Sequence, residues 1–105
     1  MFVILTSKPG QYQTIASADI EPLEAWDYRF YGRLQARFVL GRLLRATRVQ
    51  VVEDDGSKTV NWVPSKFLES FETKEEAHRE LQHLCNFGSL DAKLIPIPLA
   101  AVAAV

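Results

Sequence analysis

Cysteine is almost missing from this sequence: Cys85 is the only one in 105 residues. One thiol cannot form a disulfide within the chain, so no covalent crosslink of that kind holds the fold. An iron–sulfur cluster bound by a single chain normally needs four thiolates, and that class of cofactor is excluded as well. Since the sequence contains no other cofactor motif, we expect no cofactor.

Long apolar runs and a strong net charge are also lacking. The start of the chain, Met1–Lys8, has a short apolar run without a basic segment before it, and this run is too short for a signal peptide. No run approaches the roughly 18 apolar residues of a membrane-spanning helix. The net charge of −1 gives no strong general attraction to nucleic acid or to an anionic membrane. We therefore expect a cytoplasmic protein with no membrane partner.

Motifs of common catalytic and metal sites are missing too. There is no Gly-x-Ser-x-Gly segment, and Gly32 and Gly41 stand too far apart for a dinucleotide-binding loop. His78, His83 and Cys85 fall in one expected helix. About 140° around its axis separates the two histidines, whereas a zinc-binding helix places its histidines on one face. We expect neither an enzyme nor a metal site.

The composition that is present is typical of a folded domain. Hydrophobic residues make up 48% and charged residues 24% of the chain, which favours a globular protein over a disordered one. The length suits one domain. We expect a single domain over residues 1–98, followed by an apolar flexible tail over residues 99–105.

Several short segments indicate strands joined by turns. Phe2–Leu5 is a short apolar run, and Tyr12–Thr14 alternates as its partner strand. Between them, Pro9-Gly10 suits the two central positions of a type II turn. A second hairpin is expected over residues 48–63, with its turn at Asp54–Ser57.

Residues 33–46 allow two interpretations. Apolar and polar side chains mostly alternate from Leu34 to Leu40, and this alternation favours a strand. A helix is the alternative, because Leu34, Phe38 and Leu43 also fit one helical stripe.

The segment after residue 72 carries the clearest helix signal. Thr73 and Glu76 have the spacing of a capping box, in which each side chain accepts a hydrogen bond from a free backbone amide at the helix start. Gly88 is a natural stop, so we expect the helix at about residues 74–87. Its expected buried stripe is Ala77, Leu81, Leu84 and Cys85.

The order of these elements predicts an α+β fold. After the helix, residues 92–99 indicate a last strand, which Pro96 and Pro98 confine to the edge of a sheet or to extended coil. We expect a small, strongly twisted antiparallel sheet or a half-open barrel, with one helix in the C-terminal half of the chain.

The residues from Trp62 to Leu68, WVPSKFL, resemble the end of the SH3 domain. In that family an aromatic, an aliphatic, Pro-Ser, one further residue and an aromatic follow a hairpin. The resemblance implies an SH3-like barrel in which Pro64 and Phe67 form a short 3₁₀ turn that lines a groove for proline-rich peptide. The family's ALYDY motif and its paired tryptophans are absent, and WDYRFY offers Trp26, Tyr28 and Tyr31 as loose substitutes for that motif. The implied partner-binding residues are Tyr28, Trp62, Pro64 and Phe67.

The same aromatic residues allow a second interpretation. Trp62, Phe67 and Phe71 would be core residues around a turn that Pro64 makes rigid, because large aromatic side chains are mostly buried. The two interpretations differ in one observable, the exposure of these side chains to water.

The whole chain also resembles short proteobacterial proteins of unknown role that are sometimes labelled ferredoxin. The single cysteine excludes that label for this chain. The wider resemblance therefore leaves the function open.

Arginine is concentrated between residues 29 and 52, a stretch that contains no acidic residue. Arginine binds phosphate through two parallel hydrogen bonds, and interleaved aromatics can stack on bases, so this composition allows a nucleic-acid-binding face. The other interpretation is a solvated face balanced by acids on either side. A pI of about 6.1 favours it, since nucleic-acid-binding domains more often exceed 9. The arginines are Arg29, Arg33, Arg37, Arg42, Arg45 and Arg48.

These observations predict a non-catalytic protein-interaction module or an accessory subunit. Its unidentified protein partner would dock on the aromatic segment. Nucleic-acid binding through Arg29–Arg48 is the alternative function. A homo-oligomer formed by pairing of edge strands also stays open.

Overall fold

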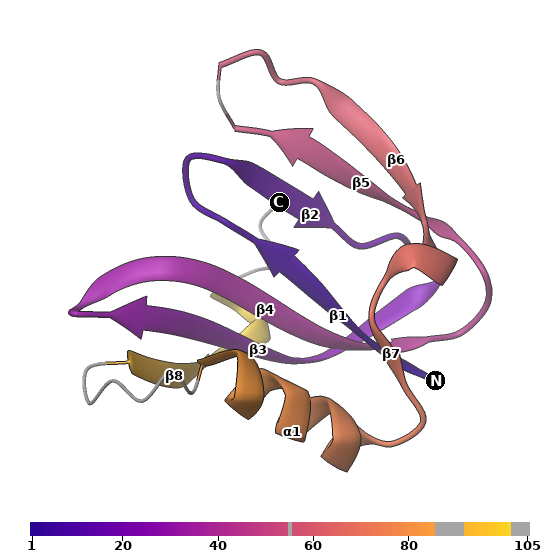
Figure 1. The fold of residues 1–105 in the computed structure, drawn as a ribbon. Helices are drawn as coiled ribbons and strands as arrows, with labels where there is room; N and C mark the ends of the chain where they lie inside the picture. The colour runs from indigo at the N-terminus through magenta and orange to yellow at the C-terminus, as the bar shows by residue number, and fades with distance from the viewer. Residues whose placement is uncertain (55, 86–91, 102–105) are drawn as a thin grey trace.

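The structure is a computed structural model that describes residues 1–54, 56–85 and 92–101. In these residues the chain forms strands, an α-helix and short 3₁₀ turns (Figure 1). The strands are β1 (Phe2–Ser7), β2 (Tyr12–Ile15), β3 (Ile20–Phe30), β4 (Arg33–Leu43), β5 (Arg48–Glu53), β6 (Val60–Pro64), β7 (Ser70–Phe71) and β8 (Ala92–Ile97). The helix is α1 (Lys74–Cys85), and the 3₁₀ turns are η1 (Ser65–Phe67) and η2 (Leu99–Ala101).

The described strands form two antiparallel sheets. Sheet A has five strands in the order β7-β1-β4-β3-β8, and sheet B has three strands in the order β2-β5-β6. Sheet A lies between sheet B on one side and α1 on the other (Figure 1). The expected α+β fold built on antiparallel strands is confirmed, and the strands that the structure describes close no barrel.

β3 and β4 form the long hairpin at the centre of sheet A. Each strand has 11 residues, and both residues of the turn between them, Tyr31 and Gly32, have positive φ (51° and 75°). Positive φ at both positions is what a type I′ turn requires. The strand interpretation of residues 33–46 is confirmed as far as Leu43, and the helical alternative is wrong.

The turn between β1 and β2 has the expected conformation. Gly10 has a φ of 74°, and the Gln11 amide donates a hydrogen bond of 3.0 Å to the Lys8 carbonyl oxygen. The two strands then diverge into different sheets (Figure 1), so their expected pairing is reduced to one bridge between Lys8 and Tyr12. β1 instead pairs with β4 and β7, while β2 pairs with β5.

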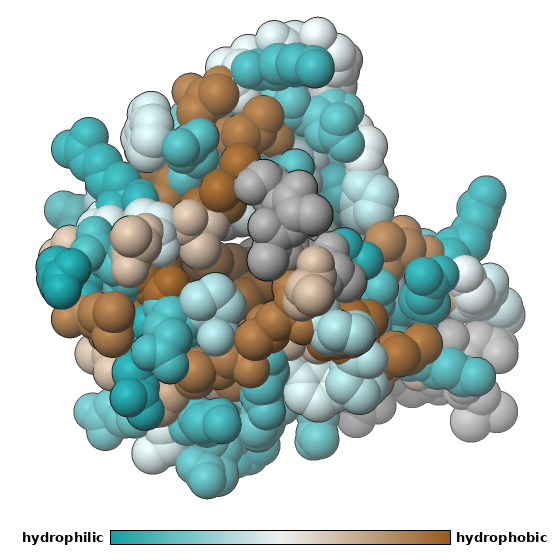
Figure 2. Space-filling model, turned by 180° about the vertical axis from the view of Figure 1, so that it is seen from behind, coloured by the Kyte–Doolittle hydropathy of each residue, from teal (hydrophilic) through white to brown (hydrophobic). Residues whose placement is uncertain are grey.

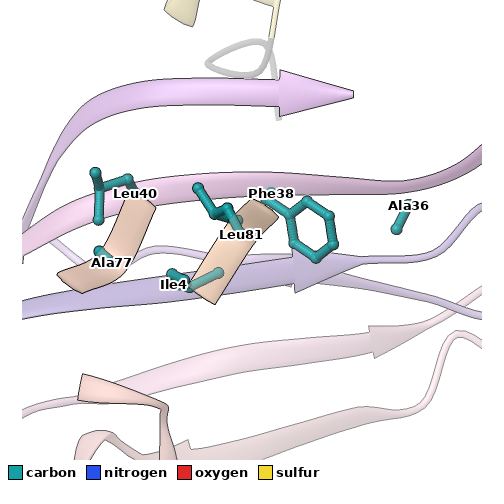
Figure 3. Packing of buried hydrophobic residues seen from close by; sticks show 6 residues of the cluster. All are labelled: Ile4, Ala36, Phe38, Leu40, Ala77 and Leu81. Carbon is teal, nitrogen blue, oxygen red and sulfur yellow. The ribbon is translucent and has the colours of Figure 1, made fainter. Parts of the chain in front are cut away.

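Two buried clusters follow from the alternation of side chains along β4. Phe38 and Leu40 face α1, whereas Val39 between them faces sheet B. Figure 3 shows the helix-side cluster, in which Leu81 of α1 lies against the residues of β4. This cluster contains Ile4, Ala36, Phe38, Leu40, Ala77 and Leu81. The cluster between the sheets contains Val3, Leu5, Ile20, Ala25, Val39 and Val49.

The start of α1 has the predicted cap. The Glu76 amide donates to the Thr73 hydroxyl oxygen over 3.2 Å, and the Glu76 carboxylate reaches back to accept from the Glu72 amide over 3.4 Å. Acidic residues in this first turn also suit the positive end of the helix dipole. Of the predicted stripe, Ala77 and Leu81 are buried and Leu84 is half-buried; the Cys85 side chain, the helix end at 86–87 and Gly88 lie outside the described residues.

β8 is an edge strand of sheet A, as its prolines predict. It pairs only with β3, from Ala25 opposite Ile97 to Phe30 opposite Ala92. After it, η2 places Leu99 against the cluster between the sheets, while residues 102–105 of the expected tail lie outside the described residues. Within the part of the chain that the structure describes, no helix has the length and apolar character needed to cross a bilayer.

Candidate functional site

An exposed aromatic corner lies where β6 passes into η1. We use this name for Trp62, Pro64 and Phe67. The Trp62 side chain is on the edge strand of sheet B and is 58% exposed, and Phe67 ends η1 and is 71% exposed. Both values are high for large aromatic side chains in a small domain, which are mostly buried.

Alternation along β6 explains why Trp62 faces outward. Val63 lies opposite Val49 and packs on the cluster between the sheets, so its side chain points inward. Trp62, one residue earlier, must therefore point to the outer face of sheet B. On that face it lies opposite Gln50, and Val60 lies opposite Val52. In the view from behind, hydrophobic side chains reach the surface at the height of sheet B (Figure 2).

Ser65 and Leu68 hold η1 so that Phe67 projects into solvent. Ser65 is buried, its amide donates to the Thr47 carbonyl oxygen over 2.8 Å, and its hydroxyl accepts from the Thr47 amide over 3.1 Å. The Leu68 amide closes the turn on the Ser65 carbonyl oxygen over 3.0 Å, and the Leu68 side chain packs on the cluster between the sheets. The residues between these two anchors, Lys66 and Phe67, are left outside.

The corner combines apolar surface with a positive charge. Pro64 has the extended backbone of a polyproline segment (φ −60°, ψ 142°) and precedes the turn directly. The Lys66 ammonium lies 5.3 Å from the centre of the Phe67 ring. Such a cation–π contact contributes about 0.5–1 kcal/mol at an exposed site. The 3₁₀ turn implied by the SH3 resemblance is therefore present at Ser65–Phe67.

The interpretation of these aromatics as core residues is correct for only one of them. Phe71 is half-buried and packs on the helix-side cluster, whereas Trp62 and Phe67 face water. The physical reason is that the small residues Ser65 and Val63 take the inward positions next to them.

Tyr28, the fourth residue implied by the resemblance, is not part of the corner. It lies on β3 in sheet A, is half-buried and packs on the helix-side cluster. There it lines a half-open cavity of about 680 Å³ with Ile4, Phe38 and Leu84 among its walls. None of the three corner residues lines this cavity.

Arg37 forms a partly buried ion pair with Asp27. It lies directly opposite Asp27 in the β3–β4 register, and its Nε and Nη2 atoms donate to the two Asp27 carboxylate oxygens over 2.7 and 3.2 Å. Asp27 is only 3% exposed. The hydrogen bond to Asp27 raises the pKa of the Arg37 guanidinium above its ordinary value.

Arg45 is paired as well, with Asp19 at the start of β3. A side-chain hydrogen bond from Thr47 and the Arg45 guanidinium hold the pKa of Asp19 below its ordinary value. Asp19 was not among the acidic residues that the sequence led us to expect as partners of the arginines. The close approach of the end of β4 to the start of β3, seen in the Leu44 amide donating to the Asp19 carbonyl oxygen over 2.8 Å, brings the two side chains together.

The other arginines are spread over both sheets. Arg29 donates to the Gly32 carbonyl oxygen over 3.1 Å, and the Arg42 guanidinium lies 5.7 Å from the centre of the Phe2 ring on the helix side of sheet A. Arg33 and Arg48 are exposed, and no ion pair involves either of them within the described residues. Arg33 lies in sheet A and Arg48 in sheet B, so the six arginines do not share one face.

One polar contact between helix and sheet was missed by sequence reasoning. His78 of α1 lies with its Nε2 atom 2.5 Å from the Glu24 Oε2 atom on β3, and the edge of its ring meets Trp26 with centroids 6.2 Å apart. The signal in the sequence is that His78 follows the buried Ala77 and so flanks the apolar stripe. No cluster of three or more His, Cys, Asp or Glu side chains suited to a metal ion occurs in residues 1–54, 56–85 and 92–101.

Comparisons of this chain with protein-family models, with curated proteins and with solved structures found no match. The resemblances to the SH3 domain and to the short proteobacterial proteins therefore stay predictions.

Proposed function

We propose that this protein is a non-catalytic interaction module, acting as an accessory subunit, that docks an extended, proline-containing segment of a partner protein on the aromatic corner. The observation that carries the proposal is the exposure of Trp62 and Phe67 on a rigid scaffold. Exposed aromatics next to a fixed turn are typical anchors of protein interfaces, where Trp and Tyr dominate the binding energy. The proposed setting is the cytoplasm.

The form of the corner supports a proline-containing ligand. Polyproline segments carry no internal hydrogen bonds and bind in aromatic-lined surfaces at small entropic cost, because they are already extended. Trp62 and Phe67 provide two exposed aromatic side chains, and Pro64 lies between them in sequence. The SH3-like order of a hairpin followed by η1 is the same order in which that family places its ligand-binding turn.

The aromatic corner predicts a loss of binding without a loss of folding. A library of proline-containing decapeptides is screened against the wild-type chain, and the selected peptide is titrated by calorimetry. Trp62→Ala and Phe67→Ala should each weaken its binding by about 30-fold or more, because truncating an anchor residue costs about 2 kcal/mol. Circular dichroism and the melting temperature should stay near wild type, since both side chains are exposed.

Tyr31→Asn is the matched control for these variants. Tyr31 is an exposed aromatic at the far end of the β3–β4 hairpin, and Asn tolerates its positive φ. This variant should bind the peptide as the wild type does. Wild-type affinity in the Trp62→Ala and Phe67→Ala variants, or unfolding of both, would sink the proposal.

Nucleic-acid binding stays the alternative, and its support is weaker because the arginines are dispersed. With Arg37 and Arg45 in ion pairs, few guanidiniums are free to contact phosphates. We expect binding to generic single- and double-stranded oligonucleotides to be weak, with a slope of log K against log salt no steeper than about −2. A slope near −5, as roughly six phosphate contacts would give, would instead favour the alternative.

A further inference from the structure

The outer edge of β6 is a row of free backbone groups. β6 pairs with β5 on one side, and none of the described strands pairs with its other side. At the two ends of the hairpin, the Glu53 amide donates to Thr59 and the Ser65 amide donates to Thr47, both over 2.8 Å.

Those two bonds fix which residues of β6 point their backbone outward. In an antiparallel pair the hydrogen-bonded positions alternate, so Thr59, Asn61 and Val63 are bonded to β5. The amide and carbonyl groups of Val60 and Trp62 therefore point away from β5. Pro64 also points outward, but it has a carbonyl group and no amide hydrogen.

This edge lacks the protection that the other edges have. β7 is only two residues long, and β8 carries Pro96 and is followed directly by Pro98. β2 is covered by β1, since Thr14 donates from its amide to Ser7 and from its hydroxyl to Thr6. β6 has five residues, VNWVP, and none is charged, although charged residues are a common way of blocking an edge.

We propose that β6 pairs with β6 of a second copy of this chain, antiparallel, so that two copies of sheet B join into one six-stranded sheet. The inference goes beyond docking at the aromatic corner, because it uses backbone groups of the edge. The absence of charge on β6 lets two identical edges meet without repulsion.

The position of Pro64 selects one register for this pairing. With Asn61 on the two-fold axis, Val60 of each copy lies opposite Trp62 of the other, and the amide and carbonyl groups of both residues form complete reciprocal hydrogen bonds. With Trp62 on the axis, the Pro64 ring would face the Val60 carbonyl oxygen, where an amide hydrogen is needed. The first register uses every outward donor of the strand.

The same register continues the apolar surface across the seam. Val60 and Trp62 are exposed on the outer face of sheet B, and pairing places Val60 of each copy beside Trp62 of the other. The edge is thus complementary to itself, which argues for a second copy over an unrelated peptide. A seam of five residues from each copy is much smaller than the roughly 20–30 residues a side of a stable interface, so the dimer should depend on concentration.

The experiment is a sedimentation and hydrogen-exchange series on the wild-type chain from about 1 µM to about 1 mM, a range that covers weak association. The mean mass should rise from monomer toward dimer. Over the same range, exchange of the Val60 and Trp62 amides should slow by about tenfold or more, whereas the Asn61 and Val63 amides should be protected throughout. A monomer at every concentration, or fast exchange at Val60 and Trp62 in the dimer, would overturn the proposal.

Variants separate this interface from the aromatic corner. Val60→Pro removes an outward amide hydrogen that β5 does not use, so this variant should stay monomeric. Val60→Thr is its control. It retains both the amide and a branched side chain, and it should dimerise as the wild type does. Phe67→Ala should dimerise normally while losing the proline-containing peptide, and Val60→Pro should do the reverse. Dimerisation by Val60→Pro contradicts the edge pairing. Trp62 and Pro64 belong to both surfaces, so loss of the peptide by that variant would contradict docking through the side chains of the corner alone.

Discussion

Replacement of Arg37 by Met should destabilise the protein by about 3 kcal/mol, the low end of the range for breaking a buried ion pair. The variant keeps an apolar stem of similar length, but Asp27, which is 3% exposed, loses both of its hydrogen bonds from Arg37. The buried Asp27 carboxylate is then shielded from water without a hydrogen bond from Arg37 to compensate for the lost hydration. The Arg37 side chain is one-third exposed, and for that reason we expect the lower end. Urea unfolding followed by tryptophan fluorescence measures the change.

The double variant Asp27→Asn with Arg37→Met distinguishes the lost partner from the lost packing. Removing the charge as well as its partner should restore most of the stability, because a neutral amide costs less to bury than a carboxylate. Arg33→Met, at an exposed position of the same strand, is the control and should change the stability by no more than about 0.5 kcal/mol. A small effect of Arg37→Met would show that water solvates Asp27.

Leu81→Ala should destabilise the protein by about 3 kcal/mol as well, for a different reason. Leu81 is 1% exposed and is the largest buried side chain that α1 contributes to the helix-side cluster. Truncating a buried leucine loses the transfer free energy of its methyl groups and leaves a cavity, at a cost of about 2–5 kcal/mol. Ala has the highest helix propensity, so the loss reports packing alone. Thermal and urea unfolding should agree on its size.

The neighbouring residue provides the control for this substitution. Gln82 is exposed on the same turn of α1, and Gln82→Ala should leave the stability within about 0.5 kcal/mol of wild type. A loss of stability as small as this for Leu81→Ala would contradict the packing of α1 on sheet A through this cluster. Another segment would then have to shield Phe38 and Leu40 from water.

Local patterns in the sequence were enough to predict the separate elements. The alternation around Phe38 predicts β4, and the capping box at Thr73 and Glu76 predicts the start of α1. The prolines of β8 place it at an edge. Each of these features depends on residues close together in the chain, where the periodicities of helix and strand act directly.

The division into two sheets could not be predicted in this way. It depends on β1 leaving β2 to pair with β4, and the short turn at Gly10 favours pairing of β1 with β2 instead. Side-chain hydrogen bonds from Thr14 to β1 hold the two strands close while they diverge. Nothing in the local pattern of either strand indicates that separation.

The partner of Arg37 was hidden by a β-bulge. Counting outward from the turn at Tyr31–Gly32 without interruption would place Ala36 opposite Asp27. The register shifts between Tyr28 and Arg29, and this shift brings Arg37 opposite Asp27 instead. A bulge of this kind adds one unpaired residue to β4, so it changes both which charges meet and which residues on either side of it share a face.

Composition alone also could not show that the aromatic corner is exposed, because large aromatic side chains are usually buried. The alternation that places Val63 inward and Trp62 outward was readable once the hairpin partner Val49 was known to be buried. The outward position of Phe67 depends on Ser65 as the buried residue of η1, and a serine is not the residue that one expects there.

The strand order of sheet A has a consequence for the synthesis of the protein. β1, β3 and β4 come early in the chain, but two of their neighbours in the sheet come late. β1 pairs with β7 at Ser70–Phe71, and β3 pairs with β8 at Ala92–Ile97. Contacts between such distant segments form slowly, because the closing of long loops must precede them. During synthesis the β3–β4 hairpin therefore has an open edge on β3, and lacks the cover of α1, until residues 74–97 have left the ribosome.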